Sequence, residues 1–207
     1  MIEVITGFEA VHLGAFILAG LLLNITPGAD FIFISASGIS GGPRIGMAAA
    51  LGVNLGVWIH VIAAAAGVSA ILLAYPAAYD AIRYAGAAYL LYLAWAAWRC
   101  DGILGTGAAA PSINAAIKRG FITNFLNPKT ALFIFAFIPQ FTDPVIGPIW
   151  MQILFLGAIF ELFGFLFAMS LGAASGLFAD MLRDRVGFLN KVTAVMFGGL
   201  ATRLILD

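Results

Sequence analysis

Three ionisable side chains, those of Asp30, Lys129 and Glu161, lie deep within long apolar stretches of the 207-residue chain. A charged group at the centre of a bilayer costs about 2.5–3.5 kcal/mol on insertion scales, so such residues usually face the protein interior or a water-filled cavity. The long stem of Lys129 allows it to reach Asp30 if the helices that carry them lie side by side. Two interpretations follow: a structural ion pair, or a pair that opens and closes with a bound solute or proton.

Two prolines interrupt these apolar stretches, Pro27 shortly before Asp30 and Pro128 directly before Lys129. Proline lacks a backbone donor and displaces the carbonyl group one turn earlier. Because lipid offers no partner for freed backbone groups, a helix that is broken inside a membrane must line a cavity or pack against protein. Paired interruptions of this kind indicate the binding site of a transporter.

The groups around both prolines suit a small solute that carries both charges. The N-terminus of a half-helix attracts anionic groups and exposed carbonyl groups attract cations, so a zwitterion such as an amino acid matches one such site. Polar side chains beside the breaks would add neutral hydrogen bonds. The residues predicted to bind or gate the solute are Asn24, Thr26, Pro27, Gly28, Asp30, Asn54, Asn124, Asn127, Pro128 and Lys129.

Proton coupling has three candidate residues, Asp30, His60 and Glu161. A carboxyl group in apolar surroundings holds a proton more readily than it does in water, and histidine titrates near neutral pH without help. Glu161 has no basic neighbour in the sequence, which makes a purely structural role hard to justify. For His60 a structural alternative carries equal weight, namely a ring nitrogen bonded to a backbone carbonyl of a neighbouring helix.

Asn54 lies between two glycines, Gly52 and Gly56, that stand four positions apart. Small residues at this spacing allow helices to approach closely. The pattern therefore predicts packing more than function. Asn54 itself either bonds to another helix or forms part of the cavity.

Six apolar segments are long enough to cross a bilayer as helices, which takes about 20 residues. The chain is 63% hydrophobic and 10% charged, whereas soluble domains carry roughly 25% charged residues. The apolar runs are continuous, unlike the alternating strands of a membrane barrel. We therefore expect an all-α integral membrane protein with six transmembrane helices, the first and fourth of them broken. The predicted spans lie roughly at 10–36, 46–74, 81–98, 119–140, 148–172 and 187–206.

Three spans per half allow an inverted repeat, because an odd number flips the second half relative to the first. Pairing the two breaks at a fixed offset of 101 residues also pairs Pro43 with Pro144 and His60 with Glu161. Unrelated helices with coincidental prolines are the alternative. The predicted organisation is a single membrane domain, 1–207, with a first three-helix half at 1–100, a linker at 101–117 and a second half at 118–207.

The distribution of Lys and Arg predicts the orientation, because cytoplasmic loops carry an excess of both. With the N-terminus outside, the basic residues of the inner loops are Arg44, Arg99, Lys118, Arg119, Arg183, Arg185 and Lys191. The outer segments then hold only Arg83 and Arg203. We therefore expect both termini to lie outside.

Other functions lack the residues that they need. No Cys or His cluster has the spacing of metal ligands, no Gly-rich phosphate loop or nucleophile elbow occurs, and the loops are too short to house a catalytic domain. Ten basic and ten acidic residues balance, which gives no reason to expect nucleic acid as a partner. We expect neither an enzyme nor a bound metal or cofactor.

Several blocks spread over nearly the whole chain carry a family resemblance. They are Thr26-Pro-Gly-Ala-Asp30, Gly52-Val-Asn-Leu-Gly56 with His60, Ala85-Gly-Ala-Ala-Tyr-Leu90, Gly120-Phe-Ile-Thr-Asn-Phe-Leu-Asn-Pro-Lys129 and Pro139-Gln-Phe141. These blocks resemble the lysine exporter (LysE) superfamily, and within it most of all the homoserine and threonine (RhtB) branch. Asp30 and Lys129 match the family's motifs, whereas Ala29 stands where the family commonly has a second proline. Glu161 matches no motif, so its predicted role rests on burial alone.

The resemblance implies an inner-membrane exporter of amino acids or their derivatives, of the homoserine, threonine or other neutral type, driven by the proton motive force. The implied partners are an amino-acid substrate, protons and the lipid bilayer. The oligomeric state stays open, with a homo-oligomer among the options. Two alternatives also remain: an exporter of another solute such as a metal cation, which the lack of further midplane carboxylates disfavours, and a non-transporting membrane scaffold.

Overall fold

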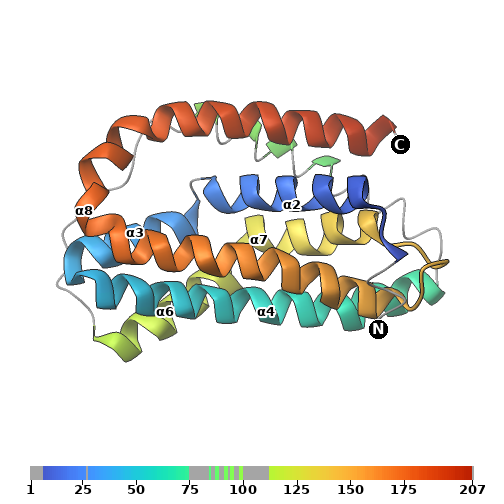
Figure 1. The fold of residues 1–207 in the computed structure, drawn as a ribbon, viewed down its shortest axis with the longest axis horizontal. Coiled ribbons are helices and arrows are strands. Elements are labelled where there is room, and N and C mark those ends of the chain that lie inside the picture. Colours follow the sequence, from blue (N-terminus) through green and yellow to red (C-terminus); the bar gives the residue numbers. More distant parts are fainter. Residues whose placement is uncertain are drawn as a thin grey trace.

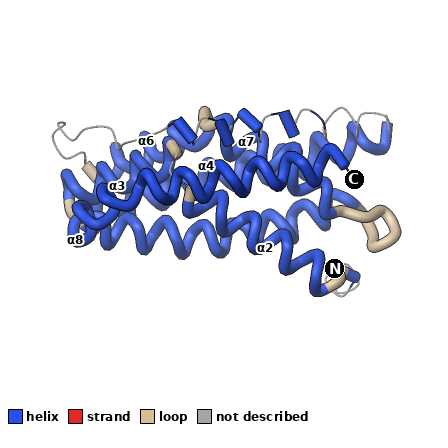
Figure 2. The backbone as a smooth tube through the Cα atoms, turned by 90° about the horizontal axis from the view of Figure 1, so that it is seen from above, coloured by secondary structure: helices blue, strands red, loops and turns tan. Residues whose placement is uncertain are grey.

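The structure is a computed structural model, and it describes residues 7–26, 28–74, 84, 87–88, 91–92, 94–95, 98–99 and 112–206. Within these residues every regular element is a helix, and the long helices lie alongside one another (Figures 1 and 2). The elements are α2 (Ala10–Ile25), α3 (Ala29–Gly41), α4 (Pro43–Ala74), α6 (Ile113–Phe125), α7 (Pro128–Leu132), the π-helix η1 (Phe133–Phe137), the 3₁₀-helix η2 (Ile138–Phe141) and α8 (Ile149–Leu206).

The two predicted breaks are present as bends between consecutive helices. Helices α2 and α3 meet at 51°, and α6 meets the segment Lys129–Phe141 at 53°. Figure 1 shows the first pair running from right to left and the second from left to right, with both bends near the middle of the molecule. The two broken helices therefore enter the centre of the fold from opposite ends.

Four of the predicted membrane spans have a counterpart among the described helices. Pro43–Gly67 and Ile149–Ser175 are long and apolar enough to cross a membrane, and each bent pair passes the same test when it is counted as one span. The predicted span at 81–98 lies mostly outside the described residues. Helix α6 begins at Ile113, inside the predicted linker.

The last two predicted spans differ from expectation, because they belong to one helix. Helix α8 is continuous over 58 residues, and Figure 1 shows it reversing direction and returning alongside the bundle. We predicted an inner loop between 172 and 187 that holds Arg183 and Arg185, but charged residues are acceptable in a helix. No proline occurs after Pro148 to remove a backbone donor, so the helical hydrogen bonds continue through the turn.

Glycines let α4 approach its neighbours closely, as their spacing predicted. A Cβ atom added at Gly52 would collide with the backbone carbonyl of Ile117, and one added at Gly56 would lie 2.8 Å from Asn124 Cβ. Both contacts are with α6. Tight packing of α4 against α6 therefore presses the end of α6, where the second break begins, into the centre of the bundle.

Candidate functional site

A cavity of about 50 Å³ lies where the two bent helix pairs meet α4 and α8. The volume is enough for a few water molecules but far below the roughly 300–1,000 Å³ of ligand pockets. A metabolite would therefore require the helices around the cavity to move apart. The predicted residues that line this cavity are Asn24, Thr26, Gly28, Asp30, Asn54, Asn124, Asn127, Lys129 and Glu161.

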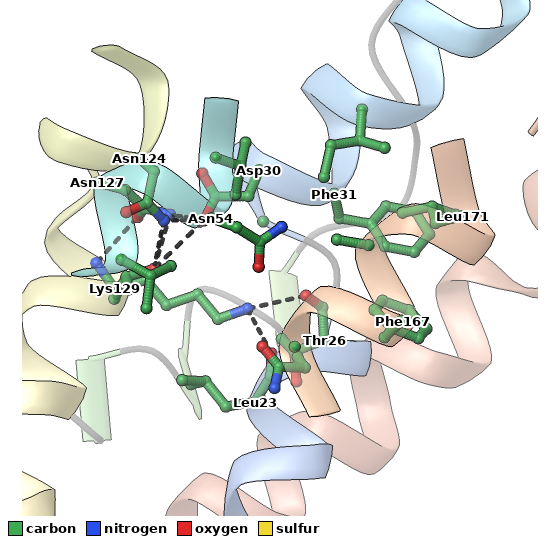
Figure 3. Close-up of a pocket in the computed structure, with 18 of the residues that line it drawn as sticks. Leu23, Thr26, Asp30, Phe31, Asn54, Asn124, Asn127, Lys129, Phe167 and Leu171 are labelled. Carbon is green, nitrogen blue, oxygen red and sulfur yellow. Dashed lines mark hydrogen bonds between the residues drawn. The ribbon is translucent and has the colours of Figure 1, made fainter. Parts of the chain in front are cut away.

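The first break is capped by a lysine from the second. Pro27 lies outside the described residues, but proline has no N–H group, so the carbonyl of Leu23 loses its helical donor. The Lys129 ammonium group takes that place, donating to Leu23 O at 3.0 Å and to Thr26 O at 2.8 Å (Figure 3). A cation is stabilising at this position, because the C-terminus of a helix carries partial negative charge.

The anticipated ion pair between Lys129 and Asp30 is consequently not formed among the described residues. The bend places the freed carbonyl groups of α2 within reach of the lysine, and they hold its ammonium group. Gly28 leaves room for the stem, since a Cβ atom added there would lie 3.2 Å from Lys129 Cδ. Asp30 and Lys129 still line one cavity, but each binds groups of the opposite break.

The Asp30 side chain gathers three donors from the second break. Its Oδ2 atom accepts hydrogen bonds from Asn124 Nδ2 and Asn127 Nδ2, both at 2.8 Å, and from Thr130 Oγ1 at 3.2 Å. The position of Asp30 in the first turn of α3 also suits an acid, because that end of a helix carries partial positive charge. Thr130 was missed by the sequence analysis, although the side chain of an N-cap residue such as Asn127 lies close to the residues two and three positions later.

The second break satisfies most of its own backbone groups. Asn127 caps α7, because its Oδ1 atom accepts from Lys129 N at 3.0 Å. Pro128 frees the carbonyl of Asn124, which accepts from Asn127 N at 2.8 Å and lies 3.2 Å from His60 Nε2. This second contact is the structural alternative considered for His60, whose ring lies outside the cavity lining and stacks on Phe125.

Asn54 lines the cavity, which was one of its two predicted placements. Its Nδ2 atom donates to Ala50 O at 2.7 Å, within its own helix. Glu161 lies on α8 on the same cavity and is 4% exposed. Of the two residues that the offset of 101 positions pairs, Glu161 lines the cavity and His60 does not.

Buried polar atoms without a hydrogen-bond partner gather at this cavity. Within the described residues they include Asn24 Nδ2, Asp30 Oδ1, Asn124 Oδ1 and Glu161 Oε2. An unpartnered buried polar atom carries a desolvation cost of about 1–3 kcal/mol, and each such atom calls for an explanation. Three acceptors and one donor beside a lysine ammonium group form a set that a bound polar solute would complete.

The apolar part of the lining was not found from the sequence. It comprises Leu23, Phe31, Ile34, Val53, Val57, Phe160, Gly164, Phe167, Ala168 and Leu171. Apolar residues in an apolar span carry little signal of their own. For the lining residues of α8, the sequence offers one signal, which is their spacing from Glu161. Residues three, four or seven positions apart lie on one face of a helix.

Comparison with known proteins places the chain in a family. The family model described as LysE type translocator matches residues 21–207. Over 205 residues the chain is 29% identical to the leucine efflux protein of Enterobacter sp. (strain 638), covering 95% of this chain and 96% of that relative. Over 132 residues it is 33% identical to the homoserine/homoserine lactone efflux protein of Salmonella typhimurium (strain LT2), covering 63% and 64% of the two chains. No solved structure matches the chain.

These matches confirm the predicted family. Together with the apolar helices they identify a multi-pass membrane transporter and not an enzyme. The chain belongs to the LysE type translocator family.

Proposed function

We propose that this translocator exports amino acids or close derivatives, of the leucine or homoserine type, across the bacterial inner membrane. The observation that carries the proposal is the cavity between the two breaks, where a lysine ammonium group and unpartnered carboxylate oxygens lie together. An amino-acid zwitterion offers a carboxylate for the lysine and an ammonium group for the carboxylate oxygens. The efflux proteins to which the chain is similar, named for leucine and homoserine, support the same substrate class.

The binding mode follows from the unpartnered atoms. The substrate ammonium group donates to Asp30 Oδ1, Asn124 Oδ1 and Glu161 Oε2, three acceptors that have no partner in the described part of the chain. The substrate carboxylate accepts from Asn24 Nδ2 and from Lys129, whose ammonium group has three N–H donors and uses two of them on backbone carbonyls. The two charges of the substrate would thus give the unpartnered acceptors a donor and the unpartnered donors an acceptor.

The architecture that we propose has six spans in two inverted halves, 1–100 and 118–207, joined by the linker 101–117. The opposite directions of the two bent helix pairs in Figure 1 support it, as do their similar bends of 51° and 53°. Both termini lie outside in this arrangement, as the loop distribution of Lys and Arg favours. Alternating access would then come from one half rocking against the other around the cavity.

Proton antiport is the proposed energy source, with Glu161 as the leading carrier. The Glu161 carboxyl group lines the cavity, and its Oε2 atom has no partner among the described residues. The substrate ammonium group and a proton can therefore occupy it in turn. Asp30 and His60 stay secondary candidates, because three donors hold Asp30 Oδ2 and a backbone carbonyl contacts His60.

Substitution Glu161→Gln tests this assignment, because glutamine keeps the shape and loses the proton. We expect leucine exchange across liposomes to persist at a lower rate, because glutamine keeps an acceptor oxygen for the substrate ammonium group but loses the charge, and uphill export driven by a pH gradient to disappear. The measurement compares counterflow with gradient-driven transport in the same preparation. Export that still depends fully on the proton gradient would overturn the role of Glu161.

Counterflow in liposomes tests the function itself. Purified protein is reconstituted with unlabelled amino acid inside, and uptake of labelled leucine, homoserine and threonine is followed, with protein-free liposomes as the control. We expect exchange of at least one neutral amino acid. Failure to exchange any amino acid would contradict the proposal, and movement of a divalent cation in its place would favour the metal-exporter alternative.

A further inference from the structure

The cavity has a polar side and an apolar side, built by different parts of the bundle. The groups around the two breaks form the polar side, and Figure 3 shows Phe31, Phe167 and Leu171 on the opposite side. The members of this apolar wall are Phe31, Ile34, Phe167, Ala168 and Leu171. Their side chains contain only carbon and hydrogen, so they offer a bound solute no hydrogen bond.

Helical spacing aligns the apolar wall with the proposed charge sites. On α3, Phe31 and Ile34 follow Asp30, and on α8 the wall residues follow Glu161 at seven and ten positions, as Ala168 and Leu171. Figure 1 shows α3 and the first arm of α8 running in the same direction. Both helices therefore carry an acid near the breaks and apolar residues further along, toward one end of the cavity.

Four of the five wall residues are buried and Phe167 is half-buried, whereas apolar residues on the outward face of α8 are exposed. Phe31 is 5% exposed and Leu171 is 8% exposed, whereas Phe165 and Leu166 are 36% and 55% exposed. The Phe31 and Phe167 rings stack with centroids 6.4 Å apart, which ties α3 to α8 at this end of the cavity. Lipid contact therefore explains the outward residues, and shaping of the cavity explains the apolar wall.

We infer that the apolar wall selects substrates by their side chain, taking apolar, uncharged side chains ahead of hydroxylated or charged ones. This inference rests on the proposed function, because the two charges of an amino acid must bind at the breaks for its side chain to face the wall. A hydroxyl group there would lose water and gain no partner. Apolar pockets reject an added hydroxyl group by up to roughly a hundredfold, so leucine is preferred to homoserine, and lysine is rejected most strongly.

The test is a counterflow profile over leucine, homoserine, lysine and phenylalanine for three proteins. The wild type is expected to exchange leucine about tenfold or more faster than homoserine. Phe167→Ala removes a ring from the wall and is expected to raise phenylalanine exchange relative to leucine by about tenfold. Phe165→Ala is the matched control, since it deletes the same side chain from the outward face of α8 and should leave the profile unchanged.

Two outcomes overturn the inference alone: wild-type exchange of homoserine as fast as leucine, or the same profile for Phe167→Ala and Phe165→Ala. Absence of exchange for every amino acid would overturn the proposed function as well. Ala168→Leu provides a second variant if Phe167→Ala does not fold. It narrows the wall and is expected to favour alanine over leucine, while Ala158→Leu, at an exposed position of α8, serves as its control.

Discussion

The two breaks look alike in sequence but satisfy their backbone groups in different ways. Each proline frees a carbonyl group four residues earlier, that of Leu23 at the first break and that of Asn124 at the second. Asn124 O is satisfied locally, by Asn127 N, with His60 nearby. Leu23 O instead depends on Lys129, which comes from the other break.

The N-termini of the half-helices that follow the two breaks also differ in how they are capped. Asn127 caps α7 with its side chain, whereas Gly28 caps α3 with no side-chain hydrogen bond. The second break is therefore largely self-sufficient, and the first is held together by its contacts with the second. If one break opens when substrate binds, we expect it to be the first, because the substrate carboxylate binds the same lysine that caps it.

The largest expected effect is that of Asp30→Asn, which weakens the contact from the first break to the second. Hydrogen bonds to charged groups contribute about 1.5–3 kcal/mol each, and Asp30 Oδ2 accepts three. Loss of about 3 kcal/mol corresponds to roughly a hundredfold. We expect leucine counterflow to fall by at least that factor, while size-exclusion chromatography shows folded protein.

The matched control for this variant is Asp143→Asn, in the loop between η2 and α8, where the carboxylate accepts from the exposed Val145 N–H and from no other group in the described part of the chain. Its counterflow should stay near that of the wild type. Wild-type transport by Asp30→Asn would show that the first break does not need its acid.

Lys129→Met removes the reciprocal contact, from the second break to the first. Two buried carbonyl groups lose their donor, and we expect the free energy of unfolding to fall by about 2–4 kcal/mol. A decrease in Tm of roughly 5–10 °C should follow, together with a fall in leucine exchange that is smaller than for Asp30→Asn. Lys118→Met, at an exposed position of α6, is the control for removing a lysine. An unchanged Tm would mean that the first break is stable without its cap.

Asn127→Ala has a smaller expected effect, because the second break keeps its other bonds. Loss of an N-cap costs about 0.5–2 kcal/mol, and Asp30 keeps two of its three donors. Ser112→Ala removes the N-cap of α6 away from the site. Asn127→Ala should lose more stability than Ser112→Ala, because it also removes one donor from Asp30, and only Asn127→Ala should impair transport. A larger loss of stability than in Lys129→Met would reverse the ranking of the two breaks.

Ala29→Pro is expected to have the smallest effect and makes the first break resemble the second, where Pro128 is the first residue of α7. Ala29 is the first residue of α3, a position that accepts proline, and the extended conformation of Gly28 suits a residue before proline. We expect a gain of about 0.4–1 kcal/mol and slower transport. Ala10→Pro, at the first residue of α2, is the control: it should give a similar gain in stability and leave the transport rate unchanged. Faster transport by Ala29→Pro would contradict the idea that the first break opens.

The breaks and their polar residues were predictable because each is encoded locally. Proline chemistry fixes where a helix is interrupted, and polar residues in an apolar span must face protein or a cavity. The partner of Lys129 was not predictable, since a long side chain reaches whichever acceptor the relative placement of two distant helices brings near. The apolar wall was hidden for another reason: Phe31 and Phe167 differ from lipid-facing phenylalanines only in their burial.

The central claim is that the two breaks together bind an amino acid by both of its charges. Displacement of labelled leucine from the purified protein by analogues tests it most directly. Leucinol keeps the ammonium group and lacks the carboxylate, and 4-methylpentanoate has the reverse. We predict that each competes at least about a hundredfold more weakly than leucine, the equivalent of about 3 kcal/mol. Competition by either analogue as strong as that of leucine would contradict the account.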